Sequence, residues 1–365
     1  MRGASKSARA ALLSLALGCA ACSDGCNCRR QKPVSAVVPD TGTGEGRVDI
    51  SATGREPRAK LEVARFTGYG YRVFVTTEAS LGIQGQMPLR MPTAQAVIQF
   101  TTVRGMANPI ARQHGGREQR LIEERGIVEK LETQSSELPK QAVDQLNLSF
   151  KPLVGTTARQ FVAEDGEVVE IRTELVGGAQ PTPEQKSILD AAWDVQKKFP
   201  FRLPSEPIGP GARWRFSEPV ELRGVRGIQV ADMTMTALDD STARIRIAIR
   251  HQAPRQEVPH PLDPRQTAML EHYRGDGEGE LTIDRTTALP LEARLATSAS
   301  LRLSAFVDGA PQVLVVNAIV VTRARAVPIS DAGAQPSPST SGAEAEPPGS
   351  GAAQNPAPPA QSSAP

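Results

Sequence analysis

Four cysteines near the start of the chain are the residues with the clearest capacity for chemistry. They are the only cysteines in the sequence: Cys19, Cys22, Cys26 and Cys28. The Cys19 thiol follows small Gly18 and the apolar run of residues 10–17. A thiol in this setting, the bacterial lipobox, accepts diacylglycerol after signal cleavage. The spacing predicts lipidation at Cys19, with Cys22 as the second choice because it lacks an aliphatic residue three positions upstream.

The residues before Cys19 are typical of a bacterial export signal. Arg2, Lys6 and Arg9 precede the apolar run. The run is shorter than the roughly 20 apolar residues that cross a bilayer, so we expect residues 1–18 to be a cleaved lipoprotein signal peptide. Cleavage without lipid attachment is the open alternative. Ala20 rather than Asp follows Cys19, which in a Gram-negative host favours the outer membrane, facing the periplasm.

The other three cysteines have the spacing Cys22-x3-Cys26-x-Cys28, which would suit a soft metal. A metal site usually needs a fourth ligand, and no histidine lies nearby. Disulfide pairing or further acylation is therefore favoured. We expect no metal and no cofactor.

The histidines give no catalytic signature. The folded region lacks a His-Glu-x-x-His helix, a Gly-x-Ser-x-Gly elbow and a Ser-x-x-Lys pair. His251, His260 and His272 share a proline-rich stretch with Asp263, interpreted as a loop between two strands. A metal or acid-base site there is conceivable, but a solvated polar loop is favoured. The sequence predicts no catalytic residue, and we expect a protein that is not an enzyme.

Composition excludes some partners. Removing the signal takes three positive charges from the formal net charge of +2 and leaves a mature chain near −1. With no large basic face, we expect no nucleic-acid partner. Aromatic residues make up only 4% of the chain, which disfavours a stacked sugar-binding platform. Membrane contact is expected through the lipid alone.

The chain divides into a tether, a domain and a tail. Residues 19–47 combine the predicted lipid attachment site with a polar segment without apolar periodicity, which suits a flexible tether. Residues 48–329 form the predicted globular domain. Residues 330–365 are almost wholly Ala, Pro, Ser, Gly and Gln, and this composition predicts disorder.

Strand patterns dominate the domain. In residues 244–250, isoleucines alternate with Arg and Ala, which predicts a strand with one buried face. Residues 157–164 and 167–175, separated by Asp165-Gly166, predict a hairpin. Three further extended stretches, residues 230–238, 291–307 and 313–325, are punctuated by possible turns at Asp239-Asp240, Asp276-Gly277 and Asp308-Gly309.

One helix is predicted at residues 182–199, where Thr182 can cap the helix and Pro183 occupies its first position. Packed across the sheet, this amphipathic helix would give an α+β domain, predominantly antiparallel β, with a curved sheet for which a half-barrel is one form. Residues 117–134 are ambiguous because Gly126 could interrupt a helix or turn a hairpin. We favour strands.

Residues 203–214 contain the turn sequence Gly209-Pro210-Gly211 followed by Trp214, and residues 277–284 and 288–292 follow downstream. These segments resemble a group of uncharacterised bacterial lipoproteins in which a proline-rich Gly-x-Gly-x-x-Trp turn leads into a late β-meander. The resemblance covers the second half of the domain. It implies an exported, lipid-anchored, β-rich protein and transfers no catalytic residue.

Three functions fit these features. The first is noncatalytic binding of a hydrophobic or amphiphilic ligand by an envelope lipoprotein, supported by the apolar runs on either side of Asn317. The second is an envelope scaffold that contacts other proteins through its sheet edges and tail. The third is a hydrolase or metalloenzyme with a dispersed site. The first is favoured.

Overall fold

The structure, a computed structural model, describes residues 48–114, 117–174, 201–222, 224–260, 263–307 and 310–329. Strands make up most of this part of the chain. They are β1 (Val48–Ala52), β2 (Gly70–Ile83), β3 (Leu89–Arg90), β4 (Thr93–Arg104), β5 (Ile110–His114), β6 (Arg117–Gln134), β7 (Thr157–Ala163), β8 (Val168–Glu174), β9 (Arg213–Leu222), β10 (Val225–Leu238), β11 (Thr242–Gln252), β12 (Gln256–His260), β13 (Asp263–Asp284), β14 (Pro290–Val307) and β15 (Ala310–Pro328). The helices are α2 (Lys140–Phe150) and the 3-10 turn η1 (Lys151–Leu153). Neither is long and apolar enough to span a bilayer.

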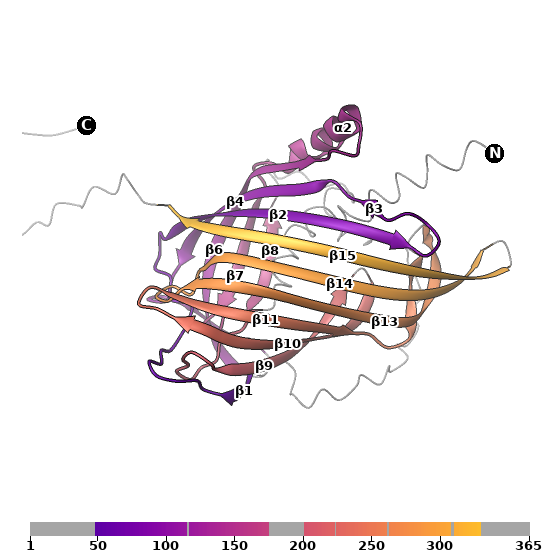
Figure 1. Ribbon diagram of the computed structural model, residues 1–365. Coiled ribbons are helices and arrows are strands. Elements are labelled where there is room, and N and C mark those ends of the chain that lie inside the picture. Colours follow the sequence, from indigo (N-terminus) through magenta and orange to yellow (C-terminus); the bar gives the residue numbers. More distant parts are fainter. Residues whose placement is uncertain are drawn as a thin grey trace, which may run out of the picture. The chain divides into compact units, whose positions relative to one another are not determined.

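All of these strands belong to one antiparallel sheet. Its order is β1-β9-β10-β11-β13-β14-β15-β2-β4-β6-β7-β8, with β3, β5 and β12 paired at the side of this path. Figure 1 shows the long strands β2, β15, β14 and β13 lying side by side. The sheet does not close, because β1 and β8 end the order. The predicted fold class, predominantly antiparallel β with a curved sheet, is confirmed.

The alternating segment forms β11 as predicted. Ile245, Ile247 and Ile249 are each no more than 2% exposed, and the residues between them are exposed. Successive side chains of a strand point to opposite faces, so the isoleucines lie on the core side. Trp214 also lies in the core, and Gly211 next to its strand has the positive φ that the turn needs.

Several other predicted strands are confirmed. β7 and β8 form the predicted hairpin around Asp165-Gly166. β10 and β11 pair across Asp239-Asp240. Residues 117–134 form the single strand β6, which runs through Gly126 without a hairpin turn. α2 and the strands from β1 to β5 were not predicted.

The turn predicted at Asp276-Gly277 is wrong. Both residues lie in the middle of the 22-residue strand β13. Gly277 faces the inner side of the sheet, where a Cβ atom would meet the Thr297 side chain at 2.8 Å. Glycine therefore makes room for a neighbouring strand here, whereas the Asp-Gly pair usually marks a turn.

Five predictions lie outside the described residues. They are the signal peptide at residues 1–18, the tether with its cysteines at residues 19–47, the helix at residues 182–199, the tail at residues 330–365, and the turn at Asp308 and Gly309. The flanking residues Val307 and Ala310 are paired across β14 and β15.

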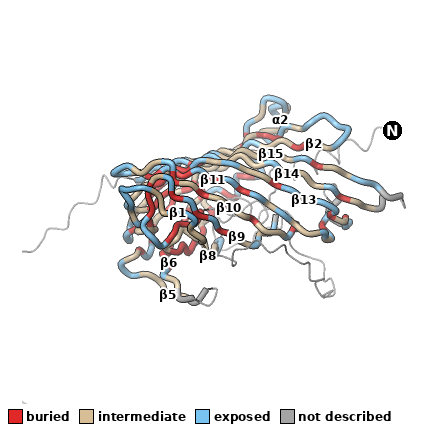
Figure 2. Tube along the Cα trace, turned by 60° about the horizontal axis from the view of Figure 1, so that its bottom comes forward, coloured by how far each residue is buried: buried red, intermediate tan, exposed pale blue. Residues whose placement is uncertain are grey.

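The sheet curves so that side chains from its two halves share one core. Ile122 of β6 and Val162 of β7 belong to the same buried cluster as Trp214 of β9 and Ile247 of β11. Figure 2 shows the buried backbone concentrated near β1, β6 and β8. The core therefore fills one end of the curved sheet.

Two connecting segments link the two halves of the sheet through individual backbone hydrogen bonds rather than through paired strands. In residues 201–212, the Leu203 amide donates to the Asp165 carbonyl at 2.7 Å, and Ile208 pairs with Ala59. In residues 53–69, the Val63 amide donates to the Glu164 carbonyl at 2.9 Å. These segments satisfy backbone groups that an open sheet would leave unpaired.

Candidate functional site

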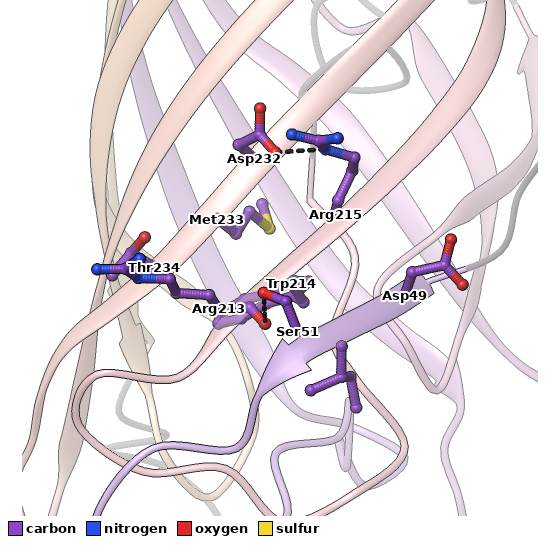
Figure 3. A pocket seen from close by; sticks show the side chains of 9 residues that line it. Asp49, Ser51, Arg213, Trp214, Arg215, Asp232, Met233 and Thr234 are labelled. Carbon is purple, nitrogen blue, oxygen red and sulfur yellow. Dashed lines mark hydrogen bonds and ion pairs between the residues drawn. The ribbon is translucent and has the colours of Figure 1, made fainter. Parts of the chain in front are cut away.

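A surface hollow of about 450 Å³ lies over β1, β9 and β10. Figure 3 shows Asp232 and Arg215 at its rim and Trp214 and Met233 beneath. The Asp232 carboxylate accepts from Arg215 Nε at 2.5 Å and from Arg250 Nη2 at 2.9 Å. Trp214 and Met233 are at most 2% exposed. Because the charges are paired and the apolar side chains are buried, this hollow offers a ligand little surface.

A second group of polar side chains lies inside the curved sheet around Arg202. Only 7% of the Arg202 side chain is exposed. Its guanidinium contacts Asp165 at 3.4 Å, Glu218 at 3.4 Å, and Glu167. Asp165 and Glu167 belong to the β7–β8 turn region, whereas Glu218 is on β9. This Arg202 cluster therefore links the two halves of the sheet.

The Arg202 cluster continues along the inner face to His251. Gln229 Nε2 donates to Glu218 Oε1 at 2.9 Å, and His251 Nε2 lies 2.6 Å from Gln229 Oε1. Because the amide oxygen can only accept, His251 Nε2 must be the donor in this contact. The row thus runs from the β7–β8 turn region through β9 and β10 to β11.

Burial and charge shift the pKa values along this row. Burial raises the pKa of Glu218, and the Arg202 charge only partly opposes it. Burial also raises the pKa of Asp165, again against the influence of Arg202. Burial lowers the pKa of the His251 imidazole, with Asp276 acting in the opposite direction. Because three carboxylates share one guanidinium, its charge lowers the pKa values of Glu218 and Asp165 less than burial raises them.

A separate polar centre surrounds Glu124 on β6. The Glu124 side chain is fully buried and accepts from Arg65 Nη1 at 2.7 Å. Its second oxygen accepts from the Tyr71 hydroxyl at 2.9 Å and from Gln160 Nε2 at 2.7 Å. Burial lowers the Arg65 pKa, but the Glu124 charge and hydrogen bond more than offset this, so the net pKa is raised. This centre is buried and pairs one positive charge with one negative charge, so it is suited to stabilising the fold.

The middle of the inner face differs from the filled end. Gly277, Thr297, Val320 and Ala79 are directly opposed neighbours across β13, β14, β15 and β2. Each lies an even number of residues from an inward-facing side chain of its own strand: buried Leu281, Ala293 or Ala326, or partly buried Val73. Because successive side chains of a strand alternate between the two faces, all four also face inward. All four are only partly buried, as are five inward neighbours: Ala299, Ala318, Thr322, Thr77 and Ala94. We call these nine residues the inner belt.

Apolar clusters lie on both sides of the inner belt. The large core is at one end, and a cluster containing Val258, Leu270 and Leu303 is at the other. The residues of the belt are small or of medium size, and none is charged. An amphiphile with an apolar chain is the ligand class that such a surface suits, because burial of apolar area provides the binding free energy.

The predicted histidine site is not a loop. His251 is the second-last residue of β11, His260 ends β12, and His272 lies within β13. His251 is part of the inner row, whereas His272 is exposed. The side chains of His260 and Asp263 lie outside the described set. Among the described residues, no three His, Cys, Asp or Glu side chains are grouped to hold a metal ion.

Sequence reasoning missed both arginine-centred groups and the inner belt. One usable signal was Glu124, which interrupts the apolar inward positions Ile122 and Val128 of β6. The chain matches no protein-family model, and no curated protein is significantly similar to it. The functional argument therefore depends on the residues themselves.

Proposed function

We propose that the protein is an exported, lipid-anchored envelope lipoprotein that binds a hydrophobic or amphiphilic ligand without catalysis. The anchor is Cys19, and the membrane is the outer membrane of a Gram-negative cell. The observation that carries the binding proposal is the partly exposed inner belt between two buried apolar clusters.

The size of the belt residues supports this reading. Ala299 and Ala318 are directly opposed on β14 and β15, and both side chains stay partly exposed. A close-packed core normally fills such positions with larger side chains. Apolar surface left open on the concave side of a sheet is suited to burial by a ligand.

The test is native mass spectrometry of the protein released from a bacterial envelope into detergent-free buffer. A reproducible additional mass that organic extraction identifies as lipid would support the proposal. A bare polypeptide mass, together with no fluorescence increase on adding N-phenyl-1-naphthylamine, would contradict it.

Two matched variants locate the binding surface. Ala318→Phe should fill the inner belt and reduce N-phenyl-1-naphthylamine binding by about tenfold or more. Ala296→Phe places the same side chain on the outer face of β14 and should leave binding unchanged. Equal effects of the two variants would place the probe elsewhere.

An envelope scaffold is the second candidate. β8 is the last strand of the sheet order, so one of its edges has no partner strand among the described residues. Such an edge can pair with an added strand. A stable co-purifying envelope protein, with no bound lipid, would favour this function.

A further inference from the structure

The polar row that ends at His251 continues directly into the inner belt. Glu218, Gln229 and His251 are directly opposed neighbours on β9, β10 and β11. On the next strand, β13, His251 is opposed by Gly275, which is opposed in turn by Ala299 of the belt. One line of paired residues therefore joins the buried polar row to the partly exposed apolar surface.

The His251 imidazole lies over Gly275. A Cβ atom at Gly275 would lie 3.1 Å from His251 Nδ1 and 3.3 Å from the Tyr273 hydroxyl oxygen. Glycine thus leaves the space that the imidazole uses. At the usual spacing of about 4.8 Å between strands, Ala318 lies three strands and roughly 14 Å from His251. An acyl chain that covers Ala299 and Ala318 would bring its head group to the imidazole.

One nitrogen of the His251 ring is left to accept a hydrogen bond. Nε2 donates to Gln229 Oε1 at 2.6 Å, and among the described residues no hydrogen bond involves Nδ1. Burial lowers the pKa of the imidazole, so the ring is neutral at pH 7.5 and Nδ1 carries no proton. A head group that binds at Nδ1 must therefore donate a hydrogen bond.

The charges near His251 are unfavourable for a charged head group. Asp276 acts electrostatically on His251, and Glu218 belongs to the same row, so an anionic head group would meet negative charge. Both carboxylates already have cationic partners, Arg274 for Asp276 and Arg202 for Glu218. An ammonium group would have to compete for them while losing its water. A neutral hydroxyl can donate to Nδ1 without either cost.

We propose that His251 receives the head group of the bound amphiphile, and that this head group is an uncharged hydroxyl, as in a monoacylglycerol. The acyl chain covers Ala299 and Ala318, and the hydroxyl donates to Nδ1. The inference rests on the proposed binding at the inner belt and names the class of ligand that the belt takes. His251 determines specificity here, because the belt itself discriminates only by apolar area.

The test is displacement of N-phenyl-1-naphthylamine from residues 19–365 carrying Cys19→Ser, so that no covalent acyl chain competes for the belt. The competitors share a twelve-carbon chain and differ in head group: monolaurin is uncharged, laurate is anionic and dodecylamine is cationic. At pH 7.5, below their micelle concentrations, monolaurin should displace the probe at the lowest concentration. Equal or stronger displacement by laurate or dodecylamine would overturn the hydroxyl assignment.

Two substitutions at His251 separate the Nδ1 acceptor from the contact with Gln229. His251→Gln can still donate to Gln229 but places no acceptor at the Nδ1 position. It should weaken monolaurin binding by about three- to tenfold, the effect of one neutral hydrogen bond, and leave binding of laurate and of the probe unchanged. His251→Asn can place its amide oxygen near the Nδ1 position and should restore part of the preference. His272→Gln, on an exposed histidine of β13, is the control and should behave like the parent.

The outcomes separate this inference from the function on which it rests. If the probe binds and all three competitors displace it, with a preference that His251→Gln leaves unchanged, the inner belt binds apolar chains and the role of His251 is overturned. If neither the probe nor any competitor binds to the parent, the proposed function fails and this inference fails with it.

Discussion

The two buried arginines of the inner face, Arg65 and Arg202, balance their charges differently. Arg65 meets one carboxylate, Glu124, within a fully buried group of hydrogen bonds. Arg202 meets three carboxylates, and their side chains are 18% to 31% exposed. Both arginines come from connecting segments rather than strands. The first centre has a fixed, matched charge, whereas the second has excess negative charge that responds to pH.

The largest effect is expected for Glu124→Gln. This change leaves the Arg65 guanidinium buried without a counter-charge, and breaking a buried pair costs about 3–5 kcal/mol. Urea denaturation at pH 7 measures the loss of unfolding free energy. Glu129→Gln, at the partly exposed partner of Arg72, is the control and should cost less than about 1 kcal/mol. Similar losses in the two variants would show that Glu124 is not a structural centre.

A smaller but still large loss is expected for Arg202→Met. The substitution removes the cation that three neighbouring carboxylates share, and should cost about 2–4 kcal/mol at pH 7. Their repulsion falls as they take up protons, so the loss should shrink at pH 5. Urea denaturation at both pH values checks this. A loss that is independent of pH would mean that Arg202 acts by packing alone.

The smallest effect, and the sharpest contrast, is expected for Glu218→Gln. Because burial raises the folded-state pKa of Glu218, its ionised form is penalised in the folded protein. Its favourable contribution is present below the unfolded pKa and is lost as pH rises through the folded pKa. At pH 7 the glutamine variant should therefore lie within about 1 kcal/mol of the parent, unlike the variant at Glu124.

The pH dependence gives the decisive measurement for Glu218. The unfolding free energy of Glu218→Gln, minus that of the parent, should increase from pH 4.5 to pH 7. His251 titrates in both proteins, so its opposite response cancels in this difference. A difference that decreases over this range would contradict the raised pKa.

The fold could be predicted where the sequence is locally consistent. The Arg-Ile alternation of β11 and the Asp165-Gly166 hairpin specify their strands without tertiary help. The Asp276-Gly277 pair failed because the Cβ-free face of Gly277 receives Thr297 from β14. That requirement depends on a neighbouring strand and leaves no local signal.

The sites could not be predicted because their partners are far apart along the chain. Arg65 and Glu124 are 59 residues apart, and Arg202 lies 37 residues from Asp165. Only the folded chain brings these side chains together.

The pairing of β2 with β15 determines when this sheet can be completed. The contact between Glu78 and Arg323 joins residues 245 positions apart. The first long strand, β2, therefore cannot pair with β15 until the last strand of the sheet is available. If the chain emerges amino-terminus first during export, β2 stays without this partner until β15 has followed it. Long-range pairing of this kind slows folding and prolongs the exposure of unpaired strand edges. If the protein is exported as proposed, a holding chaperone in the receiving compartment would therefore affect its yield more than that of a protein built from local hairpins.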